Sequence, residues 1–404
     1  MPKSHELRLA IIVSHPIQYY VPLYRRLARR EDLEIKVFFT WHGAEKPILD
    51  QGFKKELAWD IPLTEGYPFK VLTNVASKPG THHFWGLRNP TLTRTVLAWR
   101  PDAVVITGYA FASHLNVMRR FHRRAVPVLF RGDSHLLNQK PGFRWALKRA
   151  LLRRIYRWPA ACLYVGTHNR NYYRAFGVPE EKLFPCPHSI ETDRFAVPHE
   201  KLERQAAAWR KELSIEDSRV VLLFAGKFED KKRPLALMTA VKNYHDSNVM
   251  LVMVGDGELG DEVRKIHQSA PDRFRVLPFQ NQSRMPLVYR LGHLFVLPSA
   301  YDETWGLAVN EALACGRPVL VSDMVGCAPE LVSLGWTGEV FRADDWNDFG
   351  QKLGKALATS VKLERLHLIR FARQFDIETT ERNLVAALNA VTKNRSIFSR
   401  RAVA

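Results

Sequence analysis

The feature that most constrains the fold is a regular alternation of short apolar runs with amphipathic stretches, which occurs in two series along the 404-residue chain. In the first series the apolar runs are nearly continuous and rich in Val, Ile and Phe, as in parallel strands covered on both faces. This pattern predicts an α/β domain with helices on both sides of a parallel sheet. The expected strands are 7–13, 34–40, 103–107, 126–130 and 161–165, and the expected helices include 21–30, 91–100, 143–158 and 169–176.

The second series begins near residue 220, after prolines and a charged stretch have interrupted the pattern. Its expected strands are 220–225, 249–254, 274–277, 294–297 and 318–321. Two doubly wound, Rossmann-like domains that face one another bind their ligand in the cleft between them, at the carboxyl ends of the strands. We predict an amino-terminal domain over 1–190, a linker over 191–215, a carboxyl-terminal domain over 216–375, and a final helix with a basic tail over 376–404 that packs back on the first domain.

The charge of the chain is strongly positive and unevenly distributed. Sixty Lys and Arg stand against 41 Asp and Glu, which gives a formal net charge of +19. Residues 1–200 hold 31 of the basic residues and only 16 of the acidic ones. Such a surface attracts phosphates, acidic glycans, nucleic acid or anionic lipid headgroups.

Cysteine and hydropathy patterns exclude several classes of protein. The cysteines form no CxxC pair, so a disulfide scaffold and a zinc ribbon are excluded. The apolar run 9–13 is shorter than the ~7–15 residues of a signal-peptide core, and no run reaches the ~18–20 residues that cross a bilayer. We therefore expect a cytoplasmic protein, whether free or peripheral on the inner face of the membrane. The four cysteines are Cys162, Cys186, Cys315 and Cys327.

The most informative stretch runs from Pro298 to Val319. It predicts a helix from about Trp305, with Glu303 just before it and Glu311 inside it. At ~1.5 Å rise per residue the two glutamates would stand roughly 12 Å apart, with the amide groups of a helix N-terminus between them as a phosphate site. A lone pair of glutamates at this spacing is also compatible with a helix cap and a solvated residue.

This stretch resembles the family 4 glycosyltransferases, which have the GT-B fold. Their E-x7-E pattern is met by Glu303 and Glu311, and the subgroup form E-x-W-G-L-x-V-N-E-A is met over residues 303–312. Three further segments follow in the order of the family. They are a glycine–basic loop at 224–234, a V-G-D-G strand end at 254–259, and an S-D-rich P-E-L element at 322–331.

The resemblance implies a retaining transferase that moves a sugar from a nucleotide-diphosphate sugar to a glycan, a lipid-linked or a small-molecule acceptor, as in polysaccharide biosynthesis. Glu303 would then hold the donor sugar together with neighbouring backbone amides, Glu311 would bind the ribose, and the segment 278–285 would contact the base. The donor-binding residues that the resemblance implies are Gly226, Lys227, Lys232, Gln282, Arg284, Glu303, Thr304, Trp305, Gly306, Leu307 and Glu311.

Lys227 and Lys232 are the expected catalytic cations, beside Glu303. A diphosphate next to two carboxylates needs compensating charge, and lysines suit a leaving group whose negative charge grows. Either lysine could also be an ordinary solvated loop residue. No D-x-D triplet occurs in the chain, so we expect neither a metal nor any cofactor besides the donor substrate.

The amino-terminal half carries weaker signals. The segment after the first strand resembles the P-x-x-Y-x-x-P-L entry of one family subgroup, but it lacks the glycine pair of many relatives. His15, Gln18 and Tyr19 are therefore candidates for contact with the acceptor. A histidine that contacts the donor sugar in relatives has its counterpart near Asp133 and His135, and that catalytic role falls on one of these residues or on a backbone group.

A basic stretch over residues 119–157 holds twelve Lys or Arg and one acidic residue. Its helix 143–158 is expected to turn an apolar stripe to the core and Arg149, Arg153 and Arg157 to solvent. The alternative is a surface that docks on anionic lipid, whereas nucleic acid is not expected because no recognition motif is present. The competing functions are a nucleotide-sugar epimerase or hydrolase, and a basic protein that binds membranes or acidic polymers. The stripe consists of Phe143, Leu147, Leu151, Ile155 and Trp158.

Overall fold

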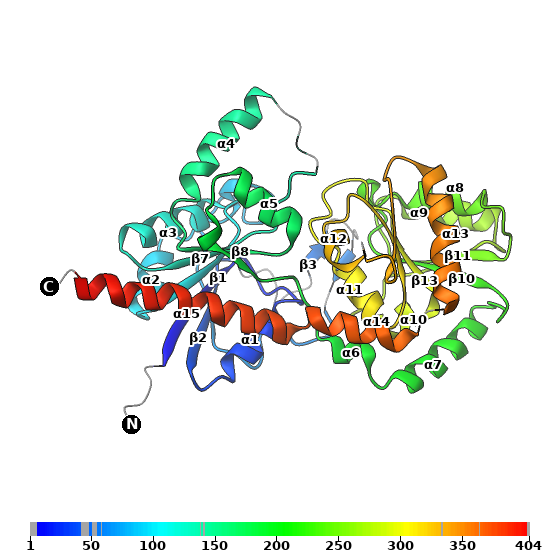
Figure 1. Ribbon diagram of the computed structural model, residues 1–404, viewed down its shortest axis with the longest axis horizontal. Helices are drawn as coiled ribbons and strands as arrows, with labels where there is room; N and C mark the ends of the chain where they lie inside the picture. The colour runs from blue at the N-terminus through cyan, green and yellow to red at the C-terminus, as the bar shows by residue number, and fades with distance from the viewer. Residues whose placement is uncertain are drawn as a thin grey trace. The chain divides into compact units, whose positions relative to one another are not determined.

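The computed structural model divides into two compact units, each built on a parallel sheet (Figure 1). Unit 1 comprises Met1–Lys46, Pro62–His188 and Ile377–Ala404, and unit 2 comprises Pro47–Ile61 and Ser189–Asp376. The structure describes residues 6–41, 48–50, 55–57, 59–137, 139, 142–332, 334–362 and 364–401.

Among the described residues of unit 1, seven parallel strands form a sheet in the order β5-β2-β1-β6-β7-β8-β9. The strands are β1 Leu7–Val13, β2 Leu33–Phe39, β5 Phe69–Val71, β6 Ala103–Thr107, β7 Val128–Arg131, β8 Ala161–Tyr164 and β9 Leu183–Pro185. The helices are α1 Val21–Ala28, η1 Phe84–Gly86, α2 Leu92–Ala98, α3 Ala112–Arg123, α4 Phe143–Ile155, α5 Thr167–Ala175, η2 Glu180–Lys182 and α15 Ile377–Arg401.

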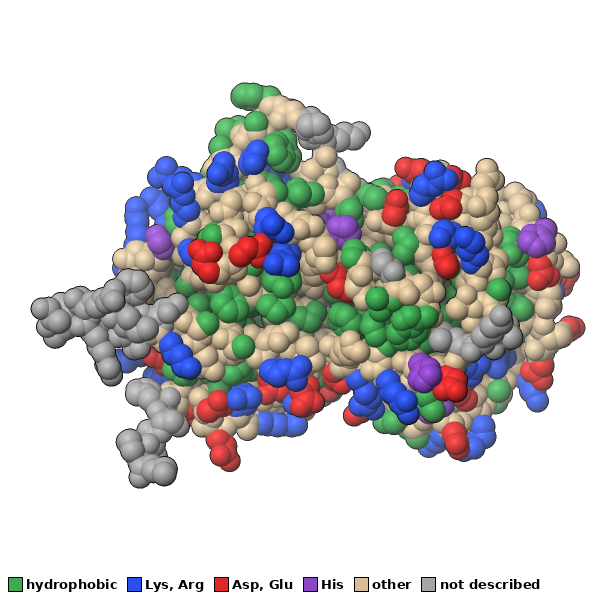
Figure 2. Space-filling view, in the orientation of Figure 1, with side chains coloured by type: hydrophobic (Ala, Val, Ile, Leu, Met, Phe, Trp, Pro, Cys, Tyr) green, Lys and Arg blue, Asp and Glu red, His purple; other side chains and the backbone are tan. Residues whose placement is uncertain are grey.

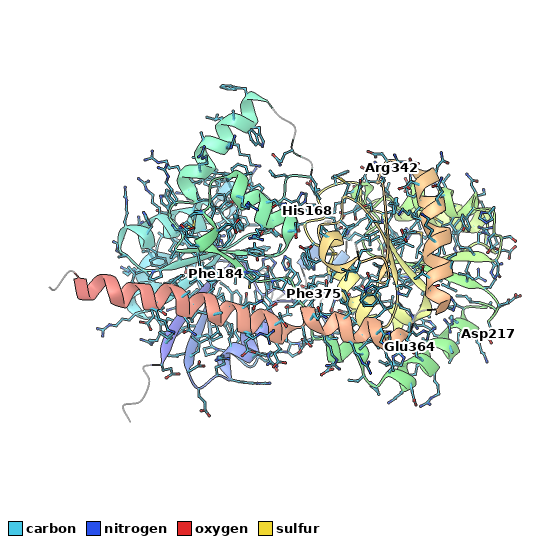
Figure 3. The ribbon with its side chains drawn as sticks, in the orientation of Figure 1. His168, Phe184, Asp217, Arg342, Glu364 and Phe375 are labelled. Carbon is cyan, nitrogen blue, oxygen red and sulfur yellow. The ribbon has the colours of Figure 1, made fainter. Side chains whose placement is uncertain are left out.

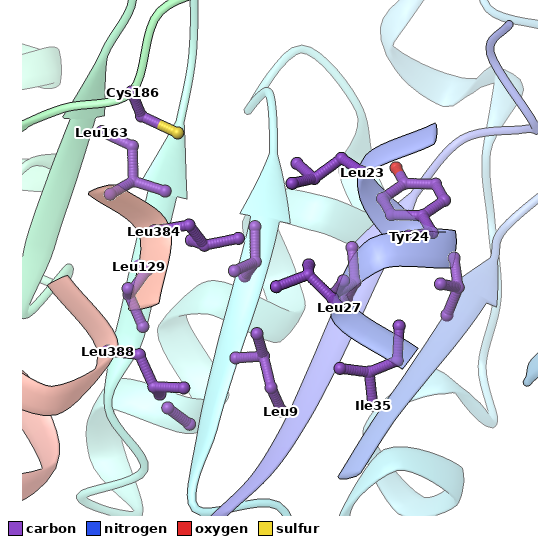
Figure 4. Close-up of a cluster of buried hydrophobic side chains, with 14 of the residues drawn as sticks. Leu9, Leu23, Tyr24, Leu27, Ile35, Leu129, Leu163, Cys186, Leu384 and Leu388 are labelled. Atoms are coloured by element: carbon purple, nitrogen blue, oxygen red, sulfur yellow. The ribbon is translucent and has the colours of Figure 1, made fainter. Parts of the chain in front are cut away.

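The strands of unit 1 bury both faces, because successive side chains of a strand point to opposite sides of the sheet. Leu9 and Ile11 of β1 join a core with α1 and α15, in which Leu384 and Leu388 are buried (Figure 4). Ala10 and Ile12 join the opposite core with α2, α3, α5 and the end of α4. Figure 3 shows the side chains that fill the space between the sheet and these helices.

Within the described part of unit 2, six parallel strands form a sheet in the order β12-β11-β10-β13-β14-β15, and β3 pairs with β4 as an antiparallel hairpin. The strands are β3 Ile48–Asp50, β4 Lys55–Leu57, β10 Val220–Ala225, β11 Val249–Val254, β12 Phe274–Leu277, β13 Leu294–Leu297, β14 Val319–Ser322 and β15 Gly338–Phe341. The helices are α6 Thr192–Ala196, α7 His199–Glu212, η3 Asp230–Lys232, α8 Pro234–Lys242, α9 Gly260–Ser269, α10 Met285–Leu291, α11 Leu307–Ala314, α12 Ala328–Leu331, α13 Trp346–Lys362, α14 Arg365–Ala372 and η4 Arg373–Phe375.

Both sheets have the doubly wound topology that places ligand sites. In unit 1 the chain moves outward on one side of β1 to β2 and returns to its other side at β6, and in unit 2 β10 is flanked in the same way by β11 and β13. Loops that leave neighbouring strands in opposite directions open a crevice at this switch point. The predicted fold class of two Rossmann-like α/β domains is confirmed.

The unit boundaries differ from the predicted domains in two places. The stretch 191–215, predicted as a linker, forms α6 and α7 inside unit 2, because Glu203 of α7 binds the guanidinium groups of Arg290, Arg317 and Arg365 at 2.7–3.2 Å. The hairpin of β3 and β4, which lies within the predicted first domain, also groups with unit 2.

The apolar stripe predicted for the core side of α4 is wrong for three of its five residues. Ile155 is buried, but Phe143, Leu147 and Leu151 are 84%, 63% and 58% exposed. Only the carboxyl-terminal end of α4 reaches the core, through Leu152, Ile155 and the following Tyr156. Figure 1 shows the earlier turns of α4 standing away from the sheet of unit 1.

Across the described residues, no helix combines the length and the apolar character that a bilayer crossing requires.

Candidate active site

The strongest cluster of functional groups lies at the switch point of unit 2, where the loops after β10 and β13 meet. The backbone amide of Ala300 donates to the carbonyl of Lys231 at 2.8 Å, which joins the two loops. The ammonium group of Lys232 forms an ion pair with Oε2 of Glu303. Both side chains keep a small accessible fraction, 15% for Lys232 and 13% for Glu303. The pair is therefore largely desolvated but open to a ligand.

Glu303 is held in place by its own loop and by the segment after β14. The hydroxyl of Ser299 donates to Glu303 Oε2 at 2.9 Å. The amide of Gly326 donates to the carbonyl of Glu303, and that of Cys327 to the carbonyl of Trp305, both at 2.9 Å. A Cβ on residue 326 would lie 2.0 Å from the carbonyl oxygen of Thr304. Only glycine permits this approach of two backbones, and it fixes where the carboxylate stands.

The helix that carries Glu311 begins later than predicted. It starts at Leu307 rather than near Trp305, because Gly306 has a φ of +96°, in the left-handed region that favours glycine. The roughly 12 Å expected between the two glutamates assumed that the whole interval was helical. Residues 303–306 instead form a non-helical entry to α11, in which Glu303 makes an isolated parallel bridge with Val325 and Gly306 is left-handed.

The charge state of Glu303 follows from two opposing effects. Burial alone raises the pKa of its carboxyl group, but the charge and the hydrogen bond of Lys232 outweigh burial and leave the pKa lowered. Glu303 is therefore a carboxylate at neutral pH, and it faces a cation. A carboxylate accepts hydrogen bonds from hydroxyl groups, and an ammonium group binds phosphate oxygens, so the pair suits a ligand that carries both.

Glu311 lies in a second polar cluster, which joins α10 and α11. The hydroxyl of Tyr289, itself 1% exposed, donates to Glu311 Oε2 at 2.6 Å. Burial raises the pKa of Glu311, and the Tyr289 hydrogen bond and the charge of Arg194 only partly oppose it. Arg194 also donates to Oε1 of Gln282 at 2.7 Å. The cluster thus links the Glu311 carboxyl to the segment predicted to contact a base.

Tyr289, Arg194 and Ser299 were not predicted from the sequence. Tyr289 stands in an apolar helix, where a tyrosine commonly packs in the core, and Arg194 lies in the stretch predicted as a linker. Ser299 lies two residues after the buried strand β13 and four residues before Glu303, and this position is the signal that could have indicated it.

The remaining predicted donor residues have varied surroundings. Gly226 and Lys227 directly follow β10 and are half-buried, as are Thr304 and Leu307 near the start of α11. The Trp305 ring is 3% exposed, donates from Nε1 to Asn310 Oδ1 at 2.8 Å, and lies 6.5 Å from the ring of Phe375. Its side chain therefore fixes the loop to α11, which leaves only its backbone for a ligand.

The segment predicted to contact a base is held from two sides. The guanidinium of Arg284 lies 4.7 Å from the ring centre of Trp209 in α7. The amide of Ser283 donates to Oδ2 of Asp60 at 3.1 Å, next to the hairpin of β3 and β4. Contact of Arg284 and Gln282 with a base stays a prediction.

In unit 1 the predicted acceptor residues also follow the first strand at its switch point. Nδ1 of His15 lies 2.9 Å from the hydroxyl of Ser14, and the ring packs edge-on against Trp41. Burial lowers the pKa of His15 to about 4, so the ring is neutral at pH 7. Tyr19 packs edge-on against His188, burial raises its pKa, and Gln18 beside it is half-buried.

Asp133 and His135, the two candidates after β7, differ in exposure. The Asp133 side chain is 51% exposed, and its Oδ2 lies 4.0 Å from Nε2 of His188. His135 is 7% exposed, and its Nδ1 accepts a hydrogen bond from the amide of Leu137 at 3.2 Å. Asp133 is therefore the more accessible of the two, and a catalytic role for either stays a prediction.

In the part of the chain that the structure describes, no three His, Cys, Asp or Glu side chains gather as a metal site would require.

A comparison with protein families finds a match for the part of the chain that contains the unit 2 cluster. Residues 205–375 match the family of glycosyl transferases group 1. The matched range contains the Lys232–Glu303 pair and the Tyr289–Glu311 hydrogen bond. It covers less than half of the chain, and all of it belongs to unit 2.

The chain is similar to curated proteins that include two D-inositol 3-phosphate glycosyltransferases and a spore coat protein. The D-inositol 3-phosphate glycosyltransferase of Geodermatophilus obscurus is 30% identical over 241 residues, or 56% of this chain and 52% of the relative. That of Stackebrandtia nassauensis is 29% identical over 239 residues, or 55% and 52%. The spore coat protein SA of Bacillus subtilis is 26% identical over 175 residues, or 41% and 46%. The chain thus spans about half the length of the curated relatives it matches.

Solved structures resemble the chain over nearly its whole length. HepE from Anabaena, in complex with UDP and glucose, has a TM-score of 0.66 at 16% identity over 95% of this chain and 100% of its own. WaaG, a glycosyltransferase of lipopolysaccharide biosynthesis, has a TM-score of 0.61 at 15% identity over 94% and 98%. At these identities the likeness shows the fold, which is the GT-B fold that the sequence resemblance implied.

Proposed function

We propose that this protein is a retaining glycosyltransferase that moves a sugar from a nucleotide-diphosphate sugar to an acceptor, without a metal ion. The observation that carries the proposal is the Lys232–Glu303 pair at the switch point of unit 2, within the range that matches the group 1 glycosyl transferases. HepE, which shares the fold, was solved with UDP-glucose. A nucleotide sugar presents the hydroxyls and phosphates that such a pair can bind.

Each residue of the cluster has a role set by its charge. The Glu303 carboxylate accepts hydrogen bonds from hydroxyls of the donor sugar, together with amides of Thr304, Trp305 and Gly306. Lys232 and Lys227 neutralise the diphosphate and stabilise the charge that grows on it as it leaves. Glu311, held by Tyr289, accepts hydrogen bonds from the ribose.

The transfer step conserves the configuration at the anomeric carbon. The bond from that carbon to the phosphate oxygen breaks, and the acceptor oxygen bonds to the same face of the sugar. The acceptor proton passes to the departing phosphate oxygen, and the nucleoside diphosphate leaves. The residues Asp133 and His135 are the candidates in unit 1 for contact with the reacting sugar.

Lysine charge takes the place of a metal ion in this proposal. Two ammonium groups match the charge of a bound diphosphate without a divalent cation. We expect that a chelator leaves the turnover of the enzyme unchanged, and we expect that added Mg²⁺ does not raise it. Activity that falls with chelator and returns with a divalent cation would contradict this part of the proposal.

The acceptor side of the reaction is assigned to unit 1. His15 is neutral at pH 7, and with Gln18 and Tyr19 it offers hydrogen-bonding groups without charge. Such groups suit the hydroxyls of a glycan, of a lipid-linked sugar or of a small polyol.

The test is an assay with UDP-, GDP- and ADP-sugars that follows free nucleoside diphosphate, with and without an acceptor extract, and then reads the product anomer by NMR. Acceptor-dependent release with retention is the expected result. Release or epimerisation without acceptor would indicate an epimerase or hydrolase instead. If no donor is bound or consumed, the transferase proposal fails.

A further inference from the structure

The first turns of α4 carry an apolar stripe that none of the described residues of unit 1 covers. Phe143, Leu147 and Leu151 follow one another at intervals of four residues, so they lie along one face of the helix. All three are more than half exposed, whereas Ile155, the next position of the stripe toward the end of the helix, and Leu152 on another face are buried. Large apolar side chains in such a row on a monomer surface mark a docking site.

Basic side chains border the stripe, and no acidic residue is near it in the sequence. Between Asp133 and Glu180 the chain holds nine Lys or Arg and neither Asp nor Glu. Arg154 falls on the same face as the stripe, three residues after Leu151, and Lys148 flanks it. Both side chains are exposed and pair with no acidic group among the described residues. Figure 2 shows apolar and basic side chains together at this end of unit 1.

We propose that α4 docks in the plane of an anionic lipid bilayer, with Phe143, Leu147 and Leu151 inserted between the headgroups. A helix with an apolar stripe and a basic border has this preference, because the stripe enters the acyl boundary while the cations meet lipid phosphates. The proposal stands apart from the glycosyltransferase activity, since it uses no residue of the unit 2 cluster.

Two other occupants fit the stripe less well. A second copy of the chain would bring two basic borders together, and the stretch around α4 has no carboxylate to compensate them. A nucleic acid or another soluble polyanion would pair with the cations, but Leu147 and Leu151 would remain in water. Only a lipid surface satisfies the apolar and the basic side chains at once.

The first experiment measures binding of the full chain to vesicles of phosphatidylcholine with and without phosphatidylglycerol. We expect binding to the anionic vesicles only, and weaker binding as salt rises. The double variant Leu147→Glu/Leu151→Glu should bind roughly 100-fold more weakly, because two inserted leucines are lost. Lys148→Ala/Arg154→Ala should bind about 30-fold more weakly, at about a factor of five for each basic residue near the surface.

The matched control is Leu334→Glu/Leu366→Glu in unit 2. These leucines are 52% and 54% exposed, close to the exposure of Leu147 and Leu151. The control adds the same two carboxylates at positions outside α4. Its vesicle binding should therefore differ from that of the wild type only by the effect of two added negative charges. Equal melting temperatures of the variants and the wild type would show that all remain folded, as expected for exposed positions.

A second readout places the helix itself. The four native cysteines are buried, so Leu147→Cys introduces an accessible thiol that an environment-sensitive dye can label. The dye emission should shift to that of an apolar environment when anionic vesicles are added, and it should stay unchanged with heparin.

Three outcomes would overturn the proposal. The first is a wild-type chain that ignores anionic vesicles, and the second is vesicle binding that Leu147→Glu/Leu151→Glu leaves intact. The third is an emission shift that depends on protein concentration without lipid, which would assign the stripe to a second copy. None of these results bears on donor use, so the glycosyltransferase proposal is tested separately.

Discussion

The two units share one topology but differ in the chemistry at their switch points. In unit 2 the loops beyond β10 and β13 bring together a cation and an anion, Lys232 and Glu303. In unit 1 the loop beyond β1 carries His15, which is neutral at pH 7, and the aromatic Tyr19. The sheet thus supplies the position of a site, whereas the loop residues decide what it binds. An ion pair suits an ionic donor. The uncharged side chains of the β1 loop suit a polyol, although the charged Arg131 and Asp133 also act on Tyr19.

The largest effect is expected from breaking the charged pair of unit 2. Lys232→Ala should lower kcat about 10²- to 10³-fold, since a group aimed at developing charge is lost. Glu303→Gln should have an effect of similar size, because it removes both the acceptor for the sugar hydroxyls and the ion pair that positions Lys232. Steady-state kinetics with the preferred donor give the values. The matched control is Lys352→Ala, which breaks the 2.8 Å ion pair with Glu339 elsewhere in unit 2. A control that lost as much activity as Lys232→Ala would show that any ion pair of unit 2 has this effect.

A smaller effect is expected at the second cluster of unit 2. Tyr289→Phe removes the hydrogen bond that holds Glu311 and should weaken nucleoside diphosphate binding about 3- to 10-fold, which corresponds to the net contribution of an ordinary hydrogen bond. The bond also lowers the pKa of Glu311. In the variant the carboxylate therefore takes up a proton at higher pH, and affinity should begin to fall at a higher pH than in the wild type.

Calorimetry of nucleoside diphosphate binding across pH measures both effects of Tyr289→Phe. Tyr173→Phe serves as the control, because its hydroxyl is equally buried but accepts from and donates to Gly132 in unit 1. An unchanged pH profile for Tyr289→Phe would leave Tyr289 with a packing role only. Loss of affinity in the control would show that any buried hydroxyl matters.

The last prediction concerns a buried neutral histidine of unit 1, His114, and the dependence of folding stability on pH. Burial lowers the pKa of His114 to about 4, while Thr107 and Gly108 partly oppose it. The unfolded chain takes up this proton near pH 6.5 and the folded chain near pH 4, so stability is complete above pH 6.5 and falls as pH drops toward 4. The slope is at most about 1.4 kcal/mol per pH unit for one histidine.

Denaturant unfolding at several pH values tests this slope. His114→Gln should flatten the curve between pH 6.5 and 4, although His15 and His293 contribute in the same sense and keep part of it. The comparison uses the slope and not the stability itself, because the substitution also disturbs the contact of His114 with Thr40. A variant with the wild-type slope would mean that His114 is protonated in the folded protein.

Local patterns predicted the sheets better than the site. Apolar runs located β1 and β11 to the residue, because the buried positions on both faces of such a strand must be apolar. The structure also brings Lys232 and Glu303 together, as the family resemblance implied. By contrast, Tyr289 meets Glu311 through a tertiary contact between two helices, and no local pattern encodes such a contact. The periodicity of α4 likewise revealed an apolar face without revealing that most of it faces solvent.

The last helix has a consequence for how the chain tolerates shortening. The residues Leu384 and Leu388 of α15 complete the hydrophobic core on one face of β1. In the sequence, nearly the whole of unit 2 lies between β1 and α15. A stop codon just after Asp376 would keep every residue of unit 2. It would nevertheless remove α15 from unit 1, which is otherwise built from the amino-terminal part of the chain. Such a fragment would expose the apolar side chains of this core, and the first-synthesised part of unit 1 can complete its core only after α15 has been made.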